Sequence, residues 1–516
     1  MDFSAETSGS NNTLWLKNFD RPDYPALTQD ITTDVCIVGG GIAGLTTAYR
    51  LICEGKKIVL IDDGKLCSGE TGRTSAHLTN VLDDRFYELE RVHGEKNASL
   101  AALSHVAAIN YIEQIILKEK IDCEFLRVDG YLFPDKKASQ KMLEKELAAA
   151  TRLGLSAEML TKAPENTFDM QSCLKFPNQA QFHPVKYLTQ LAEIIVKKGG
   201  KIYENTRAIK FDNGLPVRVI TKDKCAITAN ALVVATNVPV NDRVIVHTKQ
   251  ESRRTYIIGS LIPKDSLLSA LYWDTATPYR YVRVHKGNYK YKNTECDMLI
   301  TGGEDHRTGV PPKNYEDCFH KIESWTQKHF PQILSQEFRW SGQVIEPVDY
   351  LAFIGHNPLD KDNVYIATGD SGNGLTHGTI AGLLISDLIL DRTNEWQKIY
   401  KPSRKSLKTL KGYMKNHLRT ILSYGNYFTS EKISDVDKIE RGQGAVVRRG
   451  LSKIAVYRDD NGKIHECSAI CPHLHSIVRW NSAEKTWDCP AHGSRFSGEG
   501  VVINGPANFR MKKLKV

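Results

Sequence analysis

Short apolar runs near the N-terminus predict the start of a parallel α/β domain. Residues 34–38 (DVCIV) are almost wholly apolar, which is typical of a strand buried on both faces of a sheet. A helical stretch is expected at 45–53 and a second apolar strand at 57–61. Apolar runs at 231–235 and 363–368 have the length and composition of further buried strands. This alternation of strands and helices predicts a sheet of the βαβ type.

The turn between the first strand and the first helix carries a glycine pattern with a chemical meaning. Gly39 allows a tight turn, Gly41 lets the backbone approach a pyrophosphate, and Gly44 lets the helix pack closely on the strand. The N-terminus of the helix then presents free N–H groups to the phosphates. Asp62, at the end of the second strand, is placed to accept hydrogen bonds from an adenosine ribose. The pattern predicts a dinucleotide site but does not separate FAD from NAD.

Three later segments favour FAD. The loop at 67–78 (CSGETGRTSAHL) resembles the segment that crosses the flavin in the D-amino-acid oxidase and glycine oxidase superfamily. The turn at 236–239 (TNVP) is similar to one in that superfamily, and the glycine-rich turn at 369–378 resembles the one that aims backbone N–H groups at the pyrimidine end of the flavin. The expected FAD-binding residues are Gly39, Gly41, Ile42, Ala43, Gly44, Asp62, Asp63, Gly69, Thr71, Arg73, Thr74, Ser75, Ala76, His77, Ala208, Thr236, Asp370, Gly372, Gly374, Leu375 and Thr376.

Three segments between these turns look like strands of an inserted substrate-binding sheet: 273–283, 299–308 and 339–355. They resemble one branch of the superfamily, the FAD-dependent oxidoreductases with a C-terminal Rieske domain, relatives of gamma-glutamylputrescine oxidoreductase. Candidate substrate-side residues are Tyr279, Tyr281, Arg283, His306 and His377, although a structural role is an equal alternative for each. An arginine could hold a carboxylate through two hydrogen bonds. His77 does not match the register of a covalent flavin attachment, so we expect FAD to bind without a covalent bond.

Two motifs near the C-terminus predict an iron–sulfur site. A Rieske [2Fe–2S] cluster needs two thiolates on one iron and two imidazoles on the other, delivered by two facing loops. Cys471 and His473 supply one pair, and Cys489 and His492 supply the second. A Cys₂His₂ zinc site is the main alternative, but zinc fingers usually pair Cys with Cys and His with His. The residues around the second motif and the turn at 505–507 (GPA) are similar to those of Rieske domains, which favours the cluster.

The resemblance also indicates how this cluster differs from the respiratory type. Respiratory Rieske domains brace their loops with a disulfide, whose cysteines would fall at about Ser476 and Ala491 here, so the brace is absent. Ser494 is in place to donate a hydrogen bond to a cluster sulfide, whereas Phe496 replaces the tyrosine donor of high-potential domains. Hydrogen bonds to the sulfurs raise the potential. We therefore expect a potential in the middle of the range of roughly −150 to +300 mV.

Composition places limits on the rest of the chain. With 516 residues, 41% hydrophobic and 25% charged, two or three globular domains are expected. No apolar run approaches the ~18 residues that a membrane span needs. Residues 1–12 lack the pattern of a secretory signal or a transit peptide, which predicts a cytosolic protein. Nine of the eleven cysteines are scattered singly, and we expect them to be small buried hydrophobes.

The net charge of +9 has a local source. Residues 397–430 contain no acid and eight lysines and arginines, and apolar residues recur there at three- and four-residue steps. This pattern predicts an amphipathic helix. It favours a connector that packs on its own protein over a site for a membrane surface or an acidic partner. Nucleic acid binding has no support, because no recognised binding module accompanies the charge.

Together these patterns predict a lead segment (1–33), an α/β FAD-dependent oxidoreductase domain with a Rossmann-like FAD-binding part and an interleaved antiparallel substrate-binding sheet (34–400), a basic helical connector (401–430) and an all-β Rieske domain (431–516). FAD accepts two electrons as a hydride, whereas the cluster carries one at a time. We hypothesise that the protein oxidises the C–N bond of a small amine or amino acid and passes electrons singly through the cluster to an unidentified acceptor. The alternative is an electron-transfer component or redox sensor in which the cluster feeds the flavin. A Rieske oxygenase is not expected, since no closely spaced His pair outside the cluster loop could hold a mononuclear iron.

Overall fold

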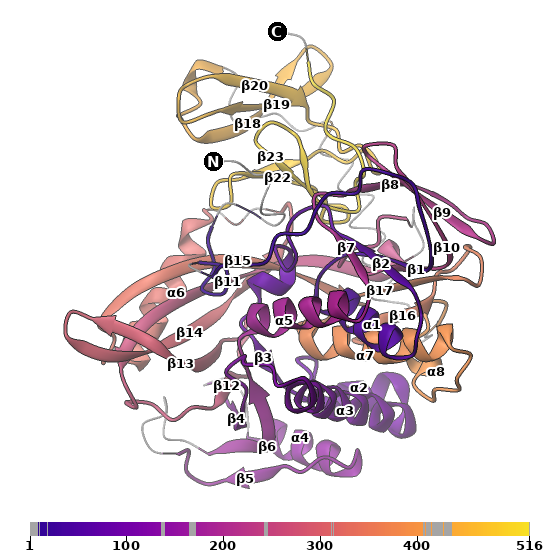
Figure 1. Cartoon of the computed structure of the whole chain (residues 1–516). Helices are drawn as coiled ribbons and strands as arrows, with labels where there is room; N and C mark the ends of the chain where they lie inside the picture. The colour runs from indigo at the N-terminus through magenta and orange to yellow at the C-terminus, as the bar shows by residue number, and fades with distance from the viewer. Residues whose placement is uncertain are drawn as a thin grey trace.

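The computed structural model describes residues 9, 11–17, 19–135, 140–164, 172–241, 246–310, 312, 314–405, 408, 414, 427 and 436–514. Figure 1 shows a large part built on two sheets and, above it in yellow, a smaller all-β part. The start of the described chain lies next to the yellow part.

An eight-stranded sheet forms the flavin-binding half of the large part. Its main order is β16-β17-β10-β1-β2-β7, and β8 and β9 are attached through β10. β1 (Ile31–Val38) pairs in parallel with β2 (Ile58–Ile61) and β10 (Ala226–Val234), and Cys36 and Ile37 at its centre are fully buried. The remaining strands of this sheet are β7 (Lys201–Tyr203), β8 (Ala208–Asp212), β9 (Val217–Thr221), β16 (Phe353–His356) and β17 (Val364–Thr368). The expected buried strands are therefore neighbours in one sheet.

Helix α1 (Ile42–Cys53) packs between α7 (Gly374–Ile389) and α5 (Pro184–Lys197). Glycine allows the close approach of α1 and α7, because a Cβ on Gly378 would lie 2.5 Å from Cγ2 of Ile42. The other helices are α2 (Phe86–His93), α3 (Glu95–Glu119), α4 (Gln140–Arg152), α6 (Glu316–His329) and α8 (Gln397–Tyr400). This packing brings the N-termini of α1 and α7 to the same region of the molecule, where the predicted site lies.

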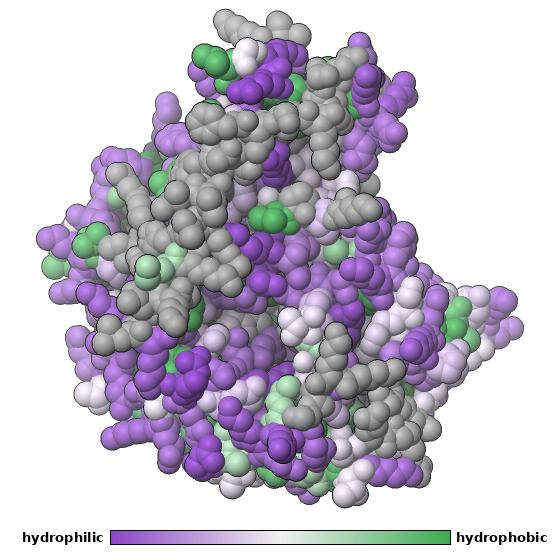
Figure 2. Space-filling view, turned by 180° about the vertical axis from the view of Figure 1, so that it is seen from behind, coloured by the Kyte–Doolittle hydropathy of each residue, from purple (hydrophilic) through white to green (hydrophobic). Residues whose placement is uncertain are grey.

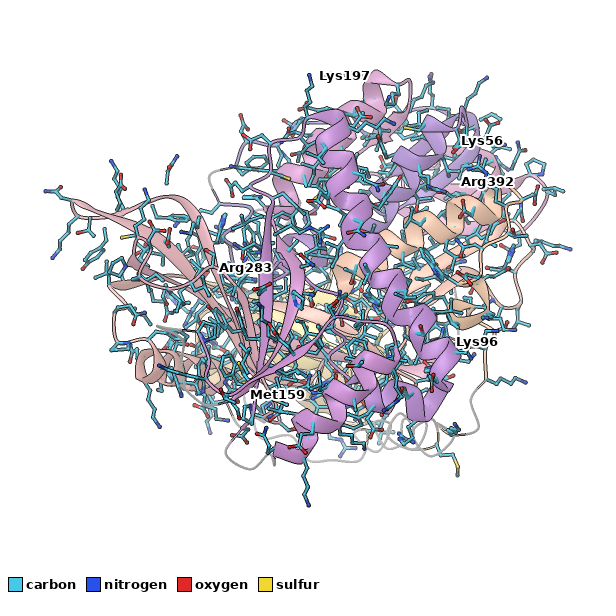
Figure 3. The ribbon with its side chains drawn as sticks, turned by 90° about the horizontal axis from the view of Figure 1, so that it is seen from below. Lys56, Lys96, Met159, Lys197, Arg283 and Arg392 are labelled. Carbon is cyan, nitrogen blue, oxygen red and sulfur yellow. The ribbon has the colours of Figure 1, made fainter. Side chains whose placement is uncertain are left out.

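Among the described helices, α3 alone is long and apolar enough to cross a membrane, which the sequence analysis did not single out. Half of its apolar window is buried inside the protein, where α3 contacts α2 and α7. Figure 3 shows α3 running along this side of the molecule, with Lys96 near one end pointing outward. On the face shown in Figure 2, the described hydrophobic residues are scattered among hydrophilic ones.

A nine-stranded sheet forms the substrate half, in the order β15-β11-β14-β13-β12-β4-β6-β3 with β5 attached to β6. Its pairs are antiparallel except that β12 runs parallel to β4. The strands are β3 (His77–Leu78), β4 (Leu126–Phe133), β5 (Glu158–Leu160), β6 (Cys173–Gln181), β11 (Gln250–Pro263), β12 (Leu271–Asp274), β13 (Tyr281–Tyr291), β14 (Thr294–Arg307) and β15 (Ser335–Pro347). The assignment of 339–355 to this sheet holds for β15, but residues 353–355 belong to β16, which pairs with β17 in the flavin sheet.

The C-terminal part contains two small antiparallel sheets. One comprises β18 (Gln443–Arg449), β19 (Ser452–Arg458) and β20 (Ile464–Ser468), and the other comprises β21 (Arg479–Asn481), β22 (Thr486–Asp488), β23 (Arg495–Ser497) and β24 (Val502–Asn504). The cluster motifs lie in the loops before β21 and between β22 and β23. Trp487 and Phe496 are fully buried on this second sheet and form part of its own hydrophobic core.

Three further sequence predictions concern the lead segment, the basic connector and the scattered cysteines. In the lead segment, Trp15 is fully buried and its indole N–H donates to the carbonyl of Thr74, so this segment is part of the fold. The predicted basic helix falls almost entirely outside the described residues. Eight of the nine scattered cysteines are buried as expected, but Cys53 is exposed, because it lies at the end of α1.

Candidate functional site

A cavity of about 730 Å³ extends between the two sheets and reaches the C-terminal domain. This volume lies within the range of small-molecule sites. Most residues proposed from the sequence line it: Gly39, Gly41, Ile42, Ala43, Asp62, Asp63, Gly69, Thr71, Arg73, Thr74, Ser75, His77, Ala208, Thr236, Tyr279, Tyr281, Asp370, Gly372, Gly374, Leu375 and His377. Five do not line it: Gly44, Ala76, Arg283, His306 and Thr376.

The glycine turn at the start of α1 has the geometry that its pattern predicts. Gly39 has a φ of +112°, and a Cβ there would lie 2.4 Å from the carbonyl oxygen of Ala235. Gly44 packs against the turn itself, since its Cβ would lie 1.9 Å from the carbonyl oxygen of Gly39. The N-cap residue, Gly41, has no side chain, and the N–H of Ile42 donates instead to the hydroxyl of Thr71 (3.3 Å). The N–H groups that follow in the first turn are the ones that can face an anionic group in the cavity.

The side chain of Asp62 stabilises this turn through hydrogen bonds. Its carboxylate accepts hydrogen bonds from the backbone N–H of Gly40 (2.6 Å) and of Gly64 (2.9 Å). Burial, with the charge of Asp63 beside it, raises the pKa of Asp62 to about 7. Both carboxylate oxygens of Asp62 are engaged by the backbone around the turn.

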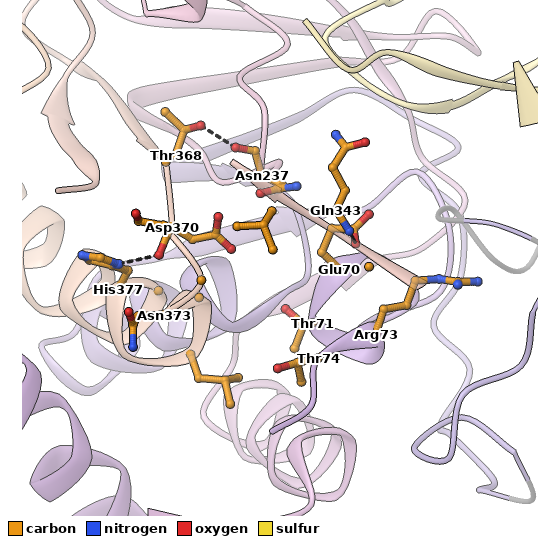
Figure 4. A pocket seen from close by; sticks show the side chains of 18 of the residues that line it. Glu70, Thr71, Arg73, Thr74, Asn237, Gln343, Thr368, Asp370, Asn373 and His377 are labelled. Atoms are coloured by element: carbon orange, nitrogen blue, oxygen red, sulfur yellow. Dashed lines mark hydrogen bonds between the residues drawn. The ribbon is translucent and has the colours of Figure 1, made fainter. Parts of the chain in front are cut away.

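The loop between β17 and α7 forms a further end of the cavity, next to the start of α1. Asn373 precedes α7 without a side-chain cap, so the N-terminal N–H groups of this helix also face the cavity. His377 lies in the first turn, where its Nδ1 is 2.8 Å from the carbonyl oxygen of Asp370 (Figure 4). Burial lowers the pKa of His377 to about 4, so it is neutral at physiological pH. This end offers hydrogen-bond donors without a fixed positive charge.

Arg73 contributes to the cavity wall, but its charge is used elsewhere. In Figure 4 its guanidinium points away from Thr71 and Thr74. It lies 3.5 Å from Glu484 of the C-terminal domain, and Arg254 lies 3.4 Å from the same carboxylate oxygen. All three side chains are fully buried. The guanidinium of Arg73 therefore joins two domains, and only the rest of the residue is left to face a flavin.

Two of the proposed substrate residues lie outside the cavity. Arg283 is buried in the interior (Figure 3), where it donates to the carbonyl of Ala76 (2.5 Å) and stacks over Trp15. His306 is 2.9 Å from the hydroxyl of Tyr256, on the far side of the sheet from the cavity lining. His306 follows Asp305, which lines the cavity, so its side chain lies on the other face of β14. Arg283 shares a face of β13 with Tyr281, but it lies two residues further along the strand, where the carbonyls of Ser75 and Ala76 accept hydrogen bonds from its guanidinium. Arg283 is therefore in no position to hold a substrate carboxylate.

A group of acidic side chains at the substrate end of the cavity was not predicted from the sequence: Asp83, Asp84, Asp305 and Glu346. Asp83 accepts a hydrogen bond from the hydroxyl of Tyr279 (2.7 Å), and burial raises its pKa to about 6. Burial likewise raises the pKa of Asp84 to about 7. Arg253, which also lines the cavity, is held by Asp305 at 2.5 Å. The sequence signal for this group was a polar Asp-Asp-Arg directly after the buried run 78–82.

The C-terminal domain closes the cavity beside Asp63 and Ala208. Its segment 502–508 contributes to the lining. Arg207 bonds Asp63 (2.5 Å) and the carbonyl of Val502 (2.9 Å), which ties this edge to the flavin domain. Asn504 donates to Glu70 at 3.0 Å, and Glu70 lines the cavity in turn. No sequence pattern predicts this contribution, because it depends on how the two domains dock.

The four predicted cluster ligands converge in the C-terminal domain. The thiols of Cys471 and Cys489 are within hydrogen-bonding range of each other, and the imidazole rings of His473 and His492 are 5.2 Å apart. The Cys489 thiol, then the backbone N–H of His473 and the hydroxyl of Ser494, lower the pKa of Cys471. Ser494 is fixed by a hydrogen bond from the N–H of Ala507 (3.1 Å). The N–H of His473 and the hydroxyl of Ser494 stabilise negative charge on the Cys471 sulfur, whereas the contact with Cys471, and then burial, raise the pKa of Cys489.

Both donor sets fit the cofactors that the motifs imply. Across the described ranges of the chain, no three His, Cys, Asp or Glu side chains gather tightly enough to hold one metal ion. A thiol pair beside an imidazole pair matches a cluster with two irons better than a single tetrahedral zinc. In the large cavity, two helix N-termini face one elongated space, which suits a dinucleotide with a phosphate bridge and an electron-accepting ring.

Comparison with known proteins agrees with these sites. The family model for FAD dependent oxidoreductases matches residues 34–388, and that for the Rieske [2Fe–2S] domain matches residues 429–515. The putative Rieske 2Fe–2S iron-sulfur protein YhfW of Bacillus subtilis (strain 168) is 32% identical over 514 residues, 97% of each chain. Gamma-glutamylputrescine oxidoreductase of Escherichia coli (strain K12) is 25% identical over 378 residues, 71% of this chain and 85% of that one.

Solved structures show the same fold in the large part. Glycine oxidase from Geobacillus kaustophilus aligns with a TM-score of 0.61 at 16% identity, over 73% of this chain and 99% of that chain. L-amino acid deaminase from Proteus vulgaris aligns with a TM-score of 0.58 at 15% identity, over 75% of this chain and all of that one. The chain is thus a flavoenzyme that belongs to the FAD dependent oxidoreductase family and carries a Rieske [2Fe–2S] domain at its C-terminal end.

Proposed function

We propose that this oxidoreductase acts on a small cationic amine, and that its electrons leave one at a time through the Rieske cluster to an external acceptor. The observation that carries the proposal is the acidic group at the substrate end of the cavity. Asp83 and Asp84 are complementary to an ammonium group, whereas Asp305 is paired with Arg253. The arginine expected to hold an amino acid's carboxylate, Arg283, is buried elsewhere. The relative gamma-glutamylputrescine oxidoreductase, named for an amine substrate, supports the same class.

Asp83 is the residue best placed to prepare the amine. Its carboxylate faces Tyr279 on one side. On the other it abuts the loop before α7, where a Cβ on Gly372 would lie 2.0 Å from Oδ2 of Asp83. With a pKa of about 6, Asp83 is mostly ionised at neutral pH and can accept the proton of a bound ammonium. Burial, and then the charge of Asp83, raise the pKa of Tyr279, so the phenol keeps its proton and stays a donor.

The remaining residues orient the amine and exclude water. Tyr279, Tyr281 and Trp273 form an aromatic wall over the cavity. FAD bound here supplies the hydride acceptor, and the cluster supplies one-electron transfer. The protein then has three tasks: to hold the C–H of the amine towards the flavin, to remove one proton from nitrogen, and to keep the site dry. The product imine would hydrolyse after release.

The test is anaerobic mixing of the cluster-loaded protein with matched pairs of compounds, while flavin absorbance and the Rieske EPR signal are followed. One pair is 1,4-diaminobutane and its carboxylated counterpart 2,5-diaminopentanoate. We expect the diamine to bleach the flavin faster, with the cluster signal rising afterwards. Faster bleaching by the carboxylated partner would contradict the preference for a simple amine.

A second outcome would favour the alternative function. If no amine or amino acid bleaches the flavin, but a reduced one-electron carrier fills the cluster and then the flavin, electrons run inward. The protein would then be an electron-transfer component or a redox sensor, and amine oxidation would be rejected.

A further inference from the structure

His247 belongs to the flavin domain but lies against the cluster ligands. It occupies a single 3₁₀ turn, His247–Lys249, directly before β11, and it is 2% exposed. Its ring centroid is 5.2 Å from that of His473 and 5.7 Å from that of His492. The two ligand rings are themselves 5.2 Å apart, so the three imidazoles form one compact triangle. One side chain of the flavin domain thus touches both ligands of one iron.

The turn that carries His247 is held firmly on the flavin domain. Lys249 donates from its ammonium group to the carbonyls of Pro402 (2.8 Å) and Arg404 (3.2 Å). Arg404 in turn is paired with the buried Asp349 at 2.7 Å. The turn that carries His247 is therefore anchored outside the cluster loops.

A short path leads from His247 to the flavin cavity. Three residues further on, the side-chain amide of Gln250 donates to the hydroxyl of Thr368 (3.2 Å). Thr368 ends β17 and lines the cavity directly before the loop that leads to α7. The connection from the cluster ligands to the flavin end of the cavity consists of one ring contact, a few backbone bonds and one hydrogen bond.

The second cluster loop is fixed against the same sheet. Ser252 donates to the carbonyl of His492 (3.2 Å), and the side-chain amide of Gln343 donates to the carbonyl of Gly493 (3.3 Å). Gly493 has a φ of +80°, and a Cβ there would lie 2.3 Å from the hydroxyl oxygen of Ser252. Gln343 also lines the flavin cavity. The cluster is therefore docked directly behind one wall of that cavity.

We propose that His247 is the contact through which flavin and cluster exchange electrons, and that it positions the two ligand imidazoles for this exchange. In each event one electron leaves the reduced flavin and one enters the oxidised cluster, with no bond formed or broken. Two such events, each followed by delivery of one electron to an external one-electron acceptor, discharge the two electrons of one amine oxidation. The inference rests on the relay part of the proposed function and is independent of the substrate.

The physical reason is the environment of the ligands. Groups that contact metal ligands orient them and adjust the potential of the metal centre, and burial of the centre also adjusts that potential. The His247 ring fills the space next to both imidazoles and keeps water from it. A smaller side chain would open this space and loosen both rings at once.

The experiment compares His247→Ala and His247→Phe with the control His356→Phe, in full-length protein loaded with FAD and iron. His356 is a histidine of the same domain that stacks on Tyr365 at 4.6 Å and contacts no cluster ligand in the described structure. The flavin is reduced photochemically without oxygen, so no substrate is needed. Cluster reduction, the Rieske EPR spectrum and the cluster's midpoint potential are then recorded.

We expect His247→Ala to slow cluster reduction about tenfold and to shift both the EPR spectrum and the potential, since supporting groups around metal ligands have effects of this size. His247→Phe keeps a ring in place and should slow the reaction less, while its EPR spectrum still changes. His356→Phe should match the unmodified protein.

The proposal is overturned if either His247 variant, with unchanged iron and FAD content, reduces its cluster at the original rate and shows the original EPR spectrum. Should the alanine variant lose its cluster, the phenylalanine variant alone decides the question. Because photoreduction bypasses the amine, a failure of the amine-oxidation proposal would leave this result intact, and the reverse also holds.

Discussion

The walls of the flavin cavity come from segments as distant as Gly39 and Asn508, whereas the four cluster ligands come from two loops between Cys471 and His492. The cluster site is local in the chain and is held by the core around Trp487 and Phe496. The cavity depends on the docking of two sheets and a second domain. The two sites therefore differ in what can remove them: loss of a single ligand for the cluster, which domain contacts only adjust, and loss of domain contacts for the cavity.

The largest expected effect comes from a cluster ligand. Cys489→Ser removes one of the two thiolates, and a weaker oxygen ligand replaces it in a buried loop. We expect loss of nearly all iron and of the Rieske EPR signal, while FAD stays bound and a substrate still bleaches it. Iron analysis and EPR measure the first effect, and flavin absorbance measures the second.

Cys53→Ser is the control, because Cys53 is exposed at the end of α1 and should retain iron at the original level. Loss of FAD together with iron in Cys489→Ser would show that the cavity depends on the cluster itself as well as on the docked domain.

The next effect concerns Glu484, which joins the two regions. Glu484→Gln leaves Arg73 and Arg254 buried without their counter-charge, which costs about 3–5 kcal/mol in comparable buried pairs. Chemical unfolding monitored by flavin release measures the loss. Asp437→Asn removes an exposed ion pair with Arg458 in the same domain and should cost under ~1 kcal/mol. Equal effects of the two variants would contradict a clamp at Glu484.

The pH dependence of this clamp has a definite sign. Burial acts to raise the pKa of Glu484, but Arg73, Arg254 and Arg495 outweigh it and the net pKa is lowered. A carboxylate with a lowered pKa stabilises the folded state above its unfolded pKa of about 4.3, and this contribution is lost as the pH falls through the folded value. The unmodified protein should therefore lose stability below about pH 4 more steeply than Glu484→Gln.

The next prediction concerns Asp83, at the substrate end of the cavity. Asp83→Asn removes the proposed proton acceptor and should lower the rate of flavin reduction by an amine about 100-fold. In the unmodified protein the rate should rise with pH through about 6, as Asp83 ionises, and this limb should be absent in the variant. Asp223→Asn, at an exposed turn before β10, should change neither the rate nor the pH profile. A variant that keeps the limb near pH 6 would assign it to another group.

The smallest expected effect concerns how much the C-terminal domain contributes to FAD binding in the cavity. Asn504→Ala removes a hydrogen bond to Glu70 and should weaken FAD binding about fivefold, the equivalent of one hydrogen bond of about 1 kcal/mol. Fluorescence titration of FAD into the flavin-free protein measures the affinity. Asn461 lies in an exposed turn of the same domain, so the control variant Asn461→Ala should bind FAD normally. Unchanged affinity in Asn504→Ala would show that the domain closes the cavity without stabilising its contents.

Much of the fold and part of the site were predictable, for local reasons. The buried strands around Cys36 and Val233 and the glycine turn at Gly39 are encoded by short apolar runs and by backbone geometry that few residues other than glycine accept. The expectation that the glycine turn and the loop before α7 contribute to one site came from resemblance to a known family, and both segments line the same cavity. Arg283 and His306 show the limit. Which face of a strand meets the cavity (His306), and how far along the strand the cavity reaches (Arg283), depend on register and on the segments that pack over the sheet.

By itself, the sequence determined the glycine turn of a dinucleotide site and the two motifs predicted to hold the cluster, because in these short-range patterns spacing along the chain fixes spacing in space. The choice of FAD over NAD rested on resemblance to a known family. The tertiary structure alone decided that Glu484 clamps Arg73, that Asn504 closes the flavin cavity and that His247 lies against the cluster imidazoles. These contacts join residues more than two hundred positions apart. They are set by the burial of two complementary domain surfaces, to which no local pattern in the chain corresponds.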